Sequence, residues 1–171
     1  MATSLYDLSV GAYTQILGAA QNVLAKGAEY CGENGIDLDS VVESRLIDDM
    51  ANFHFQVVCI YHHSLEAVRA LQSGEFRPPN YDPCDYAALQ ALIAKGLDEL
   101  GQFSADEINA LEDGKLLFKI GGNEIPFTNE NFINSFSLPN LYFHTTTAYD
   151  ILRMKGVPLG KMDYLGALKM G

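Results

Sequence analysis

The feature that most constrains this sequence is a set of four long stretches in which apolar residues recur every three or four positions. That spacing puts the apolar side chains on one face of an α-helix, which other helices must then cover. The four helices are expected at about residues 4–32, 39–74, 86–101 and 131–155. The pattern therefore predicts an all-α fold, a four-helix bundle that occupies residues 1–171 as a single domain.

Turn-forming residues separate the four helices. The segment FRPPNYDP, after the second helix, cannot be helical throughout because each proline restricts the residue before it. Between the third and fourth helices, two short β-like runs, KLLFKI and EIPF, flank Gly121, Gly122 and Asn123. This arrangement predicts a small β-hairpin. The C-terminal VPLGKMDYLGALKMG is rich in glycine and is expected to wrap over the bundle.

Composition excludes several classes of function. The net charge of −11 offers no basic surface for nucleic acid or for an anionic membrane. No apolar run is long enough to span a bilayer, and the three cysteines form no CxxC pair. The N-terminus has no signal-peptide pattern, so a cytoplasmic protein is expected. A small molecule or another protein is the expected partner.

Polar residues interrupt the apolar face of the fourth helix. Asn140, His144 and Thr147 share that face with Phe136, and Phe143 flanks them. Buried polar side chains need hydrogen-bond partners, and a facing helix can supply them.

The second helix offers matching polar groups. If it is continuous from residue 39 or 40, then Asp49, Phe53, Gln56 and His63 lie on one shoulder of its apolar stripe, and His54 lies on the other. His62 and His63 are adjacent, about 100° apart on a helix, and cannot both line one site. Both are expected at the surface or rim.

Two chemistries suit such a set, and so does a purely structural role. A histidine held by a carboxylate or an amide can act as a general acid or base, whereas two or three imidazoles could hold a divalent metal. A core histidine with a single hydrogen bond is often only structural. In the acid–base interpretation His144 moves the proton, Asp49 or His54 is its counterpart, and six residues bind or orient the substrate: Phe53, Gln56, Phe136, Asn140, Phe143 and Thr147.

Several segments resemble a known family. They are SLYDLSV, SRLIDDM with FQV after it, IGGNEIPFT, and FSLPNLYFHTTTAYDILRMKGVPLGKMDYLG. Together they resemble a family of bacterial and fungal proteins that is carried as a domain of unknown function with the DinB/YfiT-like four-helix fold. The resemblance implies an up-down-down-up helix order, a hairpin between the third and fourth helices, and a homodimer.

The wider DinB superfamily includes metal-dependent transferases and isomerases that act with small thiols. Their ligands are typically one histidine on the second helix and an HxxxH pair on the fourth. His144 matches the first histidine of that pair, but the position four residues later is Ala148. His54 could stand for the ligand on the second helix, and Asp49 could substitute for the missing one. The histidine triad is incomplete, so no cofactor is expected.

Three functions are carried forward from the sequence. The first is a metal-independent isomerase, lyase or cyclase that uses a buried histidine on a small apolar metabolite. The second is a non-catalytic bundle that binds a ligand or dimerises. The third is a metal-dependent DinB-like transferase or isomerase.

Overall fold

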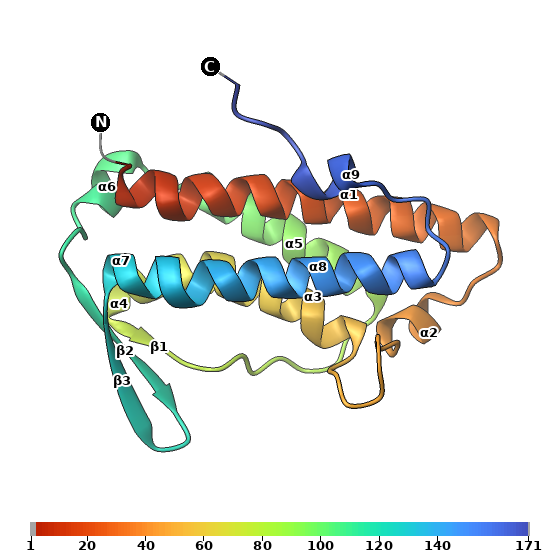
Figure 1. The fold of residues 1–171 in the computed structure, drawn as a ribbon, viewed down its shortest axis with the longest axis horizontal. Helices are drawn as coiled ribbons and strands as arrows, with labels where there is room; N and C mark the ends of the chain where they lie inside the picture. The colour runs from red at the N-terminus through yellow and green to blue at the C-terminus, as the bar shows by residue number, and fades with distance from the viewer. Residues whose placement is uncertain (1–2, 171) are drawn as a thin grey trace.

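The computed structural model describes residues 3–170, and most of these are helical (Figure 1). The first long helix consists of a π-helical turn, η1 (Asp7–Gly11), followed by α1 (Ala12–Glu33). The hydroxyl of Ser4 accepts a hydrogen bond of 3.1 Å from the Asp7 N–H, which satisfies one free donor at the helix start. The predicted start and end of this helix are confirmed.

A helix begins near residue 39 as predicted, but the prediction that it continues to residue 74 is wrong, because it is interrupted. A short helix, α2 (Leu38–Val42), is followed by an irregular turn, and the long helix begins only with α3 (Phe53–Tyr61). Asn52 caps α3, because its side chain accepts a hydrogen bond of 3.1 Å from the Phe55 N–H. The apolar spacing continues through the turn, yet Ile47 is 61% exposed, so periodicity alone did not reveal the break.

The second long helix continues through another π turn, η2 (His62–Glu66), and ends with α4 (Ala67–Ser73). Gly74 terminates it in the left-handed conformation at φ 75°, which glycine adopts without strain. A non-helical connecting segment, residues 77–85, then runs along the bundle to α5 (Tyr86–Leu100), which Asp85 caps as the sequence predicted (Figure 1). A short helix, α6 (Ala105–Asn109), follows.

A small three-stranded sheet projects from one end of the bundle (Figure 1). Strands β2 (Lys115–Ile120) and β3 (Asn123–Thr128) pair antiparallel, with Leu117 opposite Pro126. Strand β1 (Glu75–Phe76) adds to β2 in parallel, and the sequence did not predict it. It anchors the start of the connecting segment to the sheet.

The last long helix comprises α7 (Asn129–Phe132), a π turn η3 (Ile133–Ser137) and α8 (Leu138–Met154). Pro139 lies at the junction of η3 and α8, inside this long helix, where the change of helical pitch accommodates a residue that lacks an N–H. A final short helix, α9 (Lys161–Leu165), packs on α1 and is tied to it by an ion pair of 2.6 Å between Asp163 and Lys26. In Figure 1, α1 and α8 run in one direction and α3, α4 and α5 run in the other.

One cluster of buried apolar side chains fills the space between the helices. Inside this cluster, a buried chain of hydrogen bonds links α1 to the π turns η3 and η2. The Tyr13 hydroxyl donates to the Ser137 hydroxyl at 2.7 Å, and Ser137 donates to the main-chain carbonyl of His63 at 2.7 Å. Three long helices are therefore joined by polar contacts at one level of the core. Among residues 3–170, no helix combines the length and apolarity that a bilayer crossing requires.

Candidate functional site

The site centres on a hydrogen bond between the second and fourth long helices. His144 on α8 lies opposite Gln56 on α3, and its Nδ1 is 2.8 Å from the Gln56 Oε1. Both side chains are buried, Gln56 to 2% exposure and His144 to 9%. The sequence predicted that an imidazole and an amide from these two helices would converge, and the structure confirms this contact.

The partners of Gln56 fix the protonation pattern of His144. The Gln56 Nε2 donates to the main-chain carbonyl of Ala51 at 3.0 Å, so the Oε1 of the amide faces the imidazole. An amide oxygen only accepts, and therefore the His144 Nδ1 carries the hydrogen. In the neutral ring the other nitrogen, Nε2, then bears a lone pair.

The Nε2 atom of His144 has no hydrogen-bond partner among residues 3–170. It is also not sealed from solvent, in contrast to the unpartnered nitrogens of His54, His62 and His63. Two phenylalanine rings meet His144 edge-on, Phe55 at 5.9 Å and Phe143 at 5.3 Å between ring centroids. The lone pair is therefore partly accessible, and two aromatic rings border the imidazole that carries it.

Phe55 and Phe143 are 39% and 55% exposed. Phe143 was predicted to flank the polar line on the fourth helix, and its contact with His144 agrees with that position. Phe55 was not predicted. No sequence pattern indicated it, because Phe55 is adjacent to Gln56 and adjacent residues on a helix point about 100° apart.

His62 and His63 are buried, and the prediction that they lie at the surface or rim is wrong. Their exposures are 6% and 5%. The rings of His63 and His144 stack at 5.8 Å with 12° between their planes, and His62 meets His63 edge-on at 5.3 Å. We refer to these three side chains as the histidine row.

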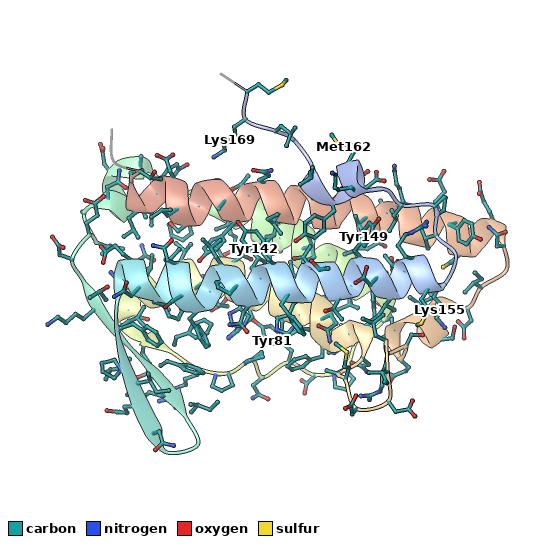
Figure 2. The ribbon with its side chains drawn as sticks, in the orientation of Figure 1. Tyr81, Tyr142, Tyr149, Lys155, Met162 and Lys169 are labelled. Carbon is teal, nitrogen blue, oxygen red and sulfur yellow. The ribbon has the colours of Figure 1, made fainter. Side chains whose placement is uncertain are left out.

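Two features that the sequence did not reveal bury the histidine row. Both His62 and His63 lie in the π turn η2, which changes the angle between successive side chains from that of an α-helix. The chain after Gly74 then folds back over them. The ring of Phe76 packs 4.5 Å from that of His62, and the His62 Nε2 donates to the Arg77 carbonyl at 2.8 Å. Tyr81, labelled in Figure 2, lies on this segment, and its ring meets that of His62 edge-on at 6.3 Å.

The histidine row is held in its neutral form. Burial, with the neighbouring imidazoles of His62 and His144, lowers the pKa of His63 to about 3. Burial and the nearby His62 lower the pKa of His144 to about 4. The pKa of His62 is also lowered by burial, opposed by its bond to Arg77 and by Glu66. At neutral pH His144 is therefore a proton acceptor.

Two predicted catalytic partners do not join His144. Asp49 lies on the exposed turn before α3, so the expectation that it faces inward is wrong, because residues 43–52 are not helical as assumed. His54 lies on α3 two positions before Gln56, which places it about 200° around the helix and away from the Gln56 side. It is half-buried, and its Nε2 is sealed without a partner.

The other predicted binding residues have mixed surroundings. Asn140 is half-buried, and its Nδ2 donates to the Phe136 carbonyl at 2.7 Å. Thr147 is buried, and its hydroxyl donates to the Phe143 carbonyl at 2.8 Å. Phe53 is fully buried and stacks on Tyr86 at 5.6 Å.

Phe136 belongs to an aromatic cluster between the sheet and the end of the bundle. Its ring lies 4.7 Å from that of Phe118 and 5.7 Å from that of Phe132, and it also meets His63 edge-on at 5.6 Å. The cluster therefore packs against His63, the middle member of the histidine row.

Two sizeable hollows in the part of the chain that the structure describes do not include His144. One, of about 640 Å³, lies between α1 and the C-terminal segment that carries Met162 and Lys169 (Figure 2). The other, of about 500 Å³, is lined by His62 together with Arg69 and Arg77. A ligand at His144 would therefore bind against the exposed Phe55 and Phe143 rather than in a deep cavity.

The metal site of the wider superfamily does not fit the residues that this chain provides. Ala148 stands where the second histidine of an HxxxH pair would lie, and its methyl group cannot coordinate a metal. Within residues 3–170, no three His, Cys, Asp or Glu side chains are grouped so that they could share a metal ion. Asp49 does not complete the set, because it lies on the exposed turn.

Both the sequence and the fold of this chain resemble those of known proteins. Residues 5–165 match the family model described as a domain of unknown function, DUF1993. A crystal structure of a DinB family member protein from Shewanella denitrificans superimposes with a TM-score of 0.81 and 30% sequence identity. The match covers 98% of this chain and 94% of that one. No curated protein matches the chain.

Proposed function

The chain belongs to the DUF1993 family of DinB-like domains of unknown function, and we propose that it binds a small, largely apolar molecule on which His144 acts as a general acid or base. One observation carries the proposal. Gln56 holds His144 in the form that has its hydrogen on Nδ1, and the Nε2 lone pair is partly accessible on an imidazole that Phe55 and Phe143 border.

The orientation and the protonation state of His144 suit a general base, and its low pKa makes that base a weak one. The bond to Gln56 orients the imidazole, and an oriented histidine transfers protons more effectively than a freely rotating one. The low pKa of His144, about 4, keeps Nε2 unprotonated at neutral pH. The reaction class that needs these features is an isomerase, lyase or cyclase step in which a proton leaves the substrate. Gln56 is the orienting partner in place of Asp49 or His54.

The test uses a probe with an acidic C–H, because the natural substrate is unidentified. Cyclohexanone in D₂O exchanges the hydrogens next to its carbonyl when a general base removes them. We expect the wild-type protein to accelerate this exchange and His144→Gln to abolish the acceleration. Equal rates for the two proteins would refute proton transfer by His144. Tyr142→Phe is a matched control, because Tyr142 is an exposed neighbour on α8.

A non-catalytic ligand-binding bundle is the second candidate. The observation that favours it is that neither the hollow of about 640 Å³ nor the one of about 500 Å³ is lined by His144, so no deep cavity encloses a substrate there. In that case the uncharged probe packs its ring against Phe55 and Phe143 and turns a C–H toward Nε2, but its hydrogens do not exchange faster than in buffer.

The metal-dependent interpretation has less support from this chain, because the three-ligand set is incomplete. Elemental analysis of protein purified without chelator tests it, and finding no stoichiometric zinc, nickel, iron or manganese would reject it. The up-down-down-up helix order belongs to this proposed assignment and is supported by the chain directions in Figure 1. A homodimer remains a prediction.

A further inference from the structure

The chemical class of the ligand can be narrowed from the hydrogen bonds around His144, on the assumption that the proposed site is correct. The Nδ1–H of His144 is used on Gln56, so the imidazole offers its ligand only a lone pair at Nε2. A lone pair cannot bind a carbonyl or a carboxylate oxygen. The ligand must therefore supply the hydrogen.

The neighbouring polar side chains on α8 direct their donors back into the protein. Asn140 donates to the Phe136 carbonyl, one turn before it, which leaves its Oδ1 without a partner among residues 3–170. The single hydroxyl hydrogen of Thr147 is used on the Phe143 carbonyl. Asn140 and His144 are four residues apart and share a face of the helix. That face therefore presents a second acceptor near the first.

Among residues 3–170, the hydrogen-bond and ring partners of His144 carry no formal charge: they are the amide of Gln56, the rings of Phe55 and Phe143, and the imidazole of His63. Burial and the nearby His62 lower the pKa of His144. His63, the member of the histidine row whose ring stacks on that of His144, is neutral as well. A carboxylate, phosphate or ammonium group would lose its hydration here without gaining an opposite charge, which is costly.

The surroundings of Nε2 are apolar. The rings of Phe55 and Phe143 both meet the imidazole of His144 in T-shaped contacts, and both rings are substantially exposed. An apolar ligand body that covered these rings would remove their surface from water, which is favourable.

We infer that the His144 site takes an uncharged molecule that donates one hydrogen bond to Nε2 and places an apolar body against Phe55 and Phe143. Small alcohols, thiols and neutral amides belong to this class. Carboxylates, phosphates and ammonium compounds do not. For a substrate, the same X–H group is positioned to give its proton to Nε2.

Four probes that share one ring separate these possibilities: benzyl alcohol, toluene, benzoate and benzylammonium. Binding is measured at about pH 7.5 from the ¹⁵N chemical shifts of the imidazoles of selectively labelled protein. We expect benzyl alcohol to shift the Nε2 signal of His144 and to bind about fivefold or more tightly than toluene, as one neutral hydrogen bond allows. Both charged probes should bind more weakly than toluene.

The matched variant is His144→Phe, which keeps an aromatic ring but removes the acceptor. In this variant benzyl alcohol should lose its advantage over toluene. If the variant does not fold, the shift of the wild-type Nε2 signal still decides the question, because only a ligand that donates to that nitrogen moves it strongly.

Two results would overturn the inference. Benzoate or benzylammonium binding at His144 as tightly as benzyl alcohol would refute the ligand class and leave the site itself standing. No shift of His144 with any probe would refute both the class and the site. Conversely, binding of benzyl alcohol without ketone exchange would keep the inference and remove the catalytic proposal.

Discussion

Replacing Gln56 by leucine should both destabilise the protein and change which nitrogen of His144 carries the hydrogen. Leucine has a similar volume but cannot accept the hydrogen bond of 2.8 Å from the His144 Nδ1 or donate to Ala51. In the variant, His144 would hold a buried N–H without an acceptor unless its hydrogen moved to Nε2. The Nε2–H form would then dominate, and the lone pair at the surface would be lost.

The size of the effect follows from burial. An unsatisfied buried donor costs about 1–3 kcal/mol. The Ala51 carbonyl is only half-buried, so water can replace its lost donor at little cost. The leucine side chain recovers part of the loss by burying apolar surface. We therefore expect a net loss of about 1–2 kcal/mol, which for a chain of this size lowers the Tm by roughly 2–8 °C.

The assay combines urea denaturation with ¹⁵N spectra of the histidine side chains. Gln72→Leu on α4 is the control, because Gln72 is exposed on a helix and should change the free energy of unfolding by less than about 0.5 kcal/mol. Gln56→Glu provides the opposite perturbation: a carboxylate facing Nδ1 should raise the pKa of His144 well above its present value of about 4. Gln56→Leu that left both the stability and the hydrogen on Nδ1 unchanged would refute the reasoning.

Three further predictions concern the elements that support the site. Stability should decrease as the pH falls below about 6.5, because unfolded histidine titrates there whereas His63 and His144 titrate at about 3 and 4 in the folded chain. Because the unfolded chain then binds more protons, the free energy of unfolding falls by roughly 2 kcal/mol per histidine at about pH 5. Equal urea midpoints at pH 7.5 and 5 would contradict this prediction. Ser137→Ala should cost about 1–3 kcal/mol by leaving the Tyr13 hydroxyl and the His63 carbonyl unpaired. Adding Tyr13→Phe should cost less than the sum of the single variants in the same denaturation assay, and strict additivity would argue against the buried chain. Asn52→Ala should destabilise the protein by about 1 kcal/mol through loss of the α3 cap. In an uninterrupted helix the same change to alanine would stabilise the protein. The sign of the shift in melting temperature therefore distinguishes a capped helix start from a continuous helix.

Local sequence determined most of the helices because apolar spacing and capping act between near neighbours. Residues 5–33 and 86–100 are helical as their patterns predicted, with Ser4 and Asp85 at their starts. The same information misplaced the start of the second long helix. Leu46 and Met50 continue the apolar spacing across the turn, and only the cap at Asn52 marks the new helix. Asp49 was mistaken for an inward residue for this reason.

The candidate site was only partly predictable. That His144 lies inward on the fourth helix followed from its place in an apolar stripe, and so did the inward position of Gln56. That these two meet each other, 88 residues apart in the chain, depends on the register between α3 and α8. Register is set by the packing of complete helix faces, which no local pattern encodes.

The sequence by itself thus determined a mostly helical fold, the inward faces of its long helices, and the polar interruption at His144. Only the tertiary structure decided that Gln56 would orient this imidazole and that His62 and His63 would be buried beside it. The burial arises because η2 turns both side chains inward and the chain after Gly74 folds back to cover them. These contacts join residues that are distant in sequence or depend on a change of helical pitch, so they exist only once the helices have packed.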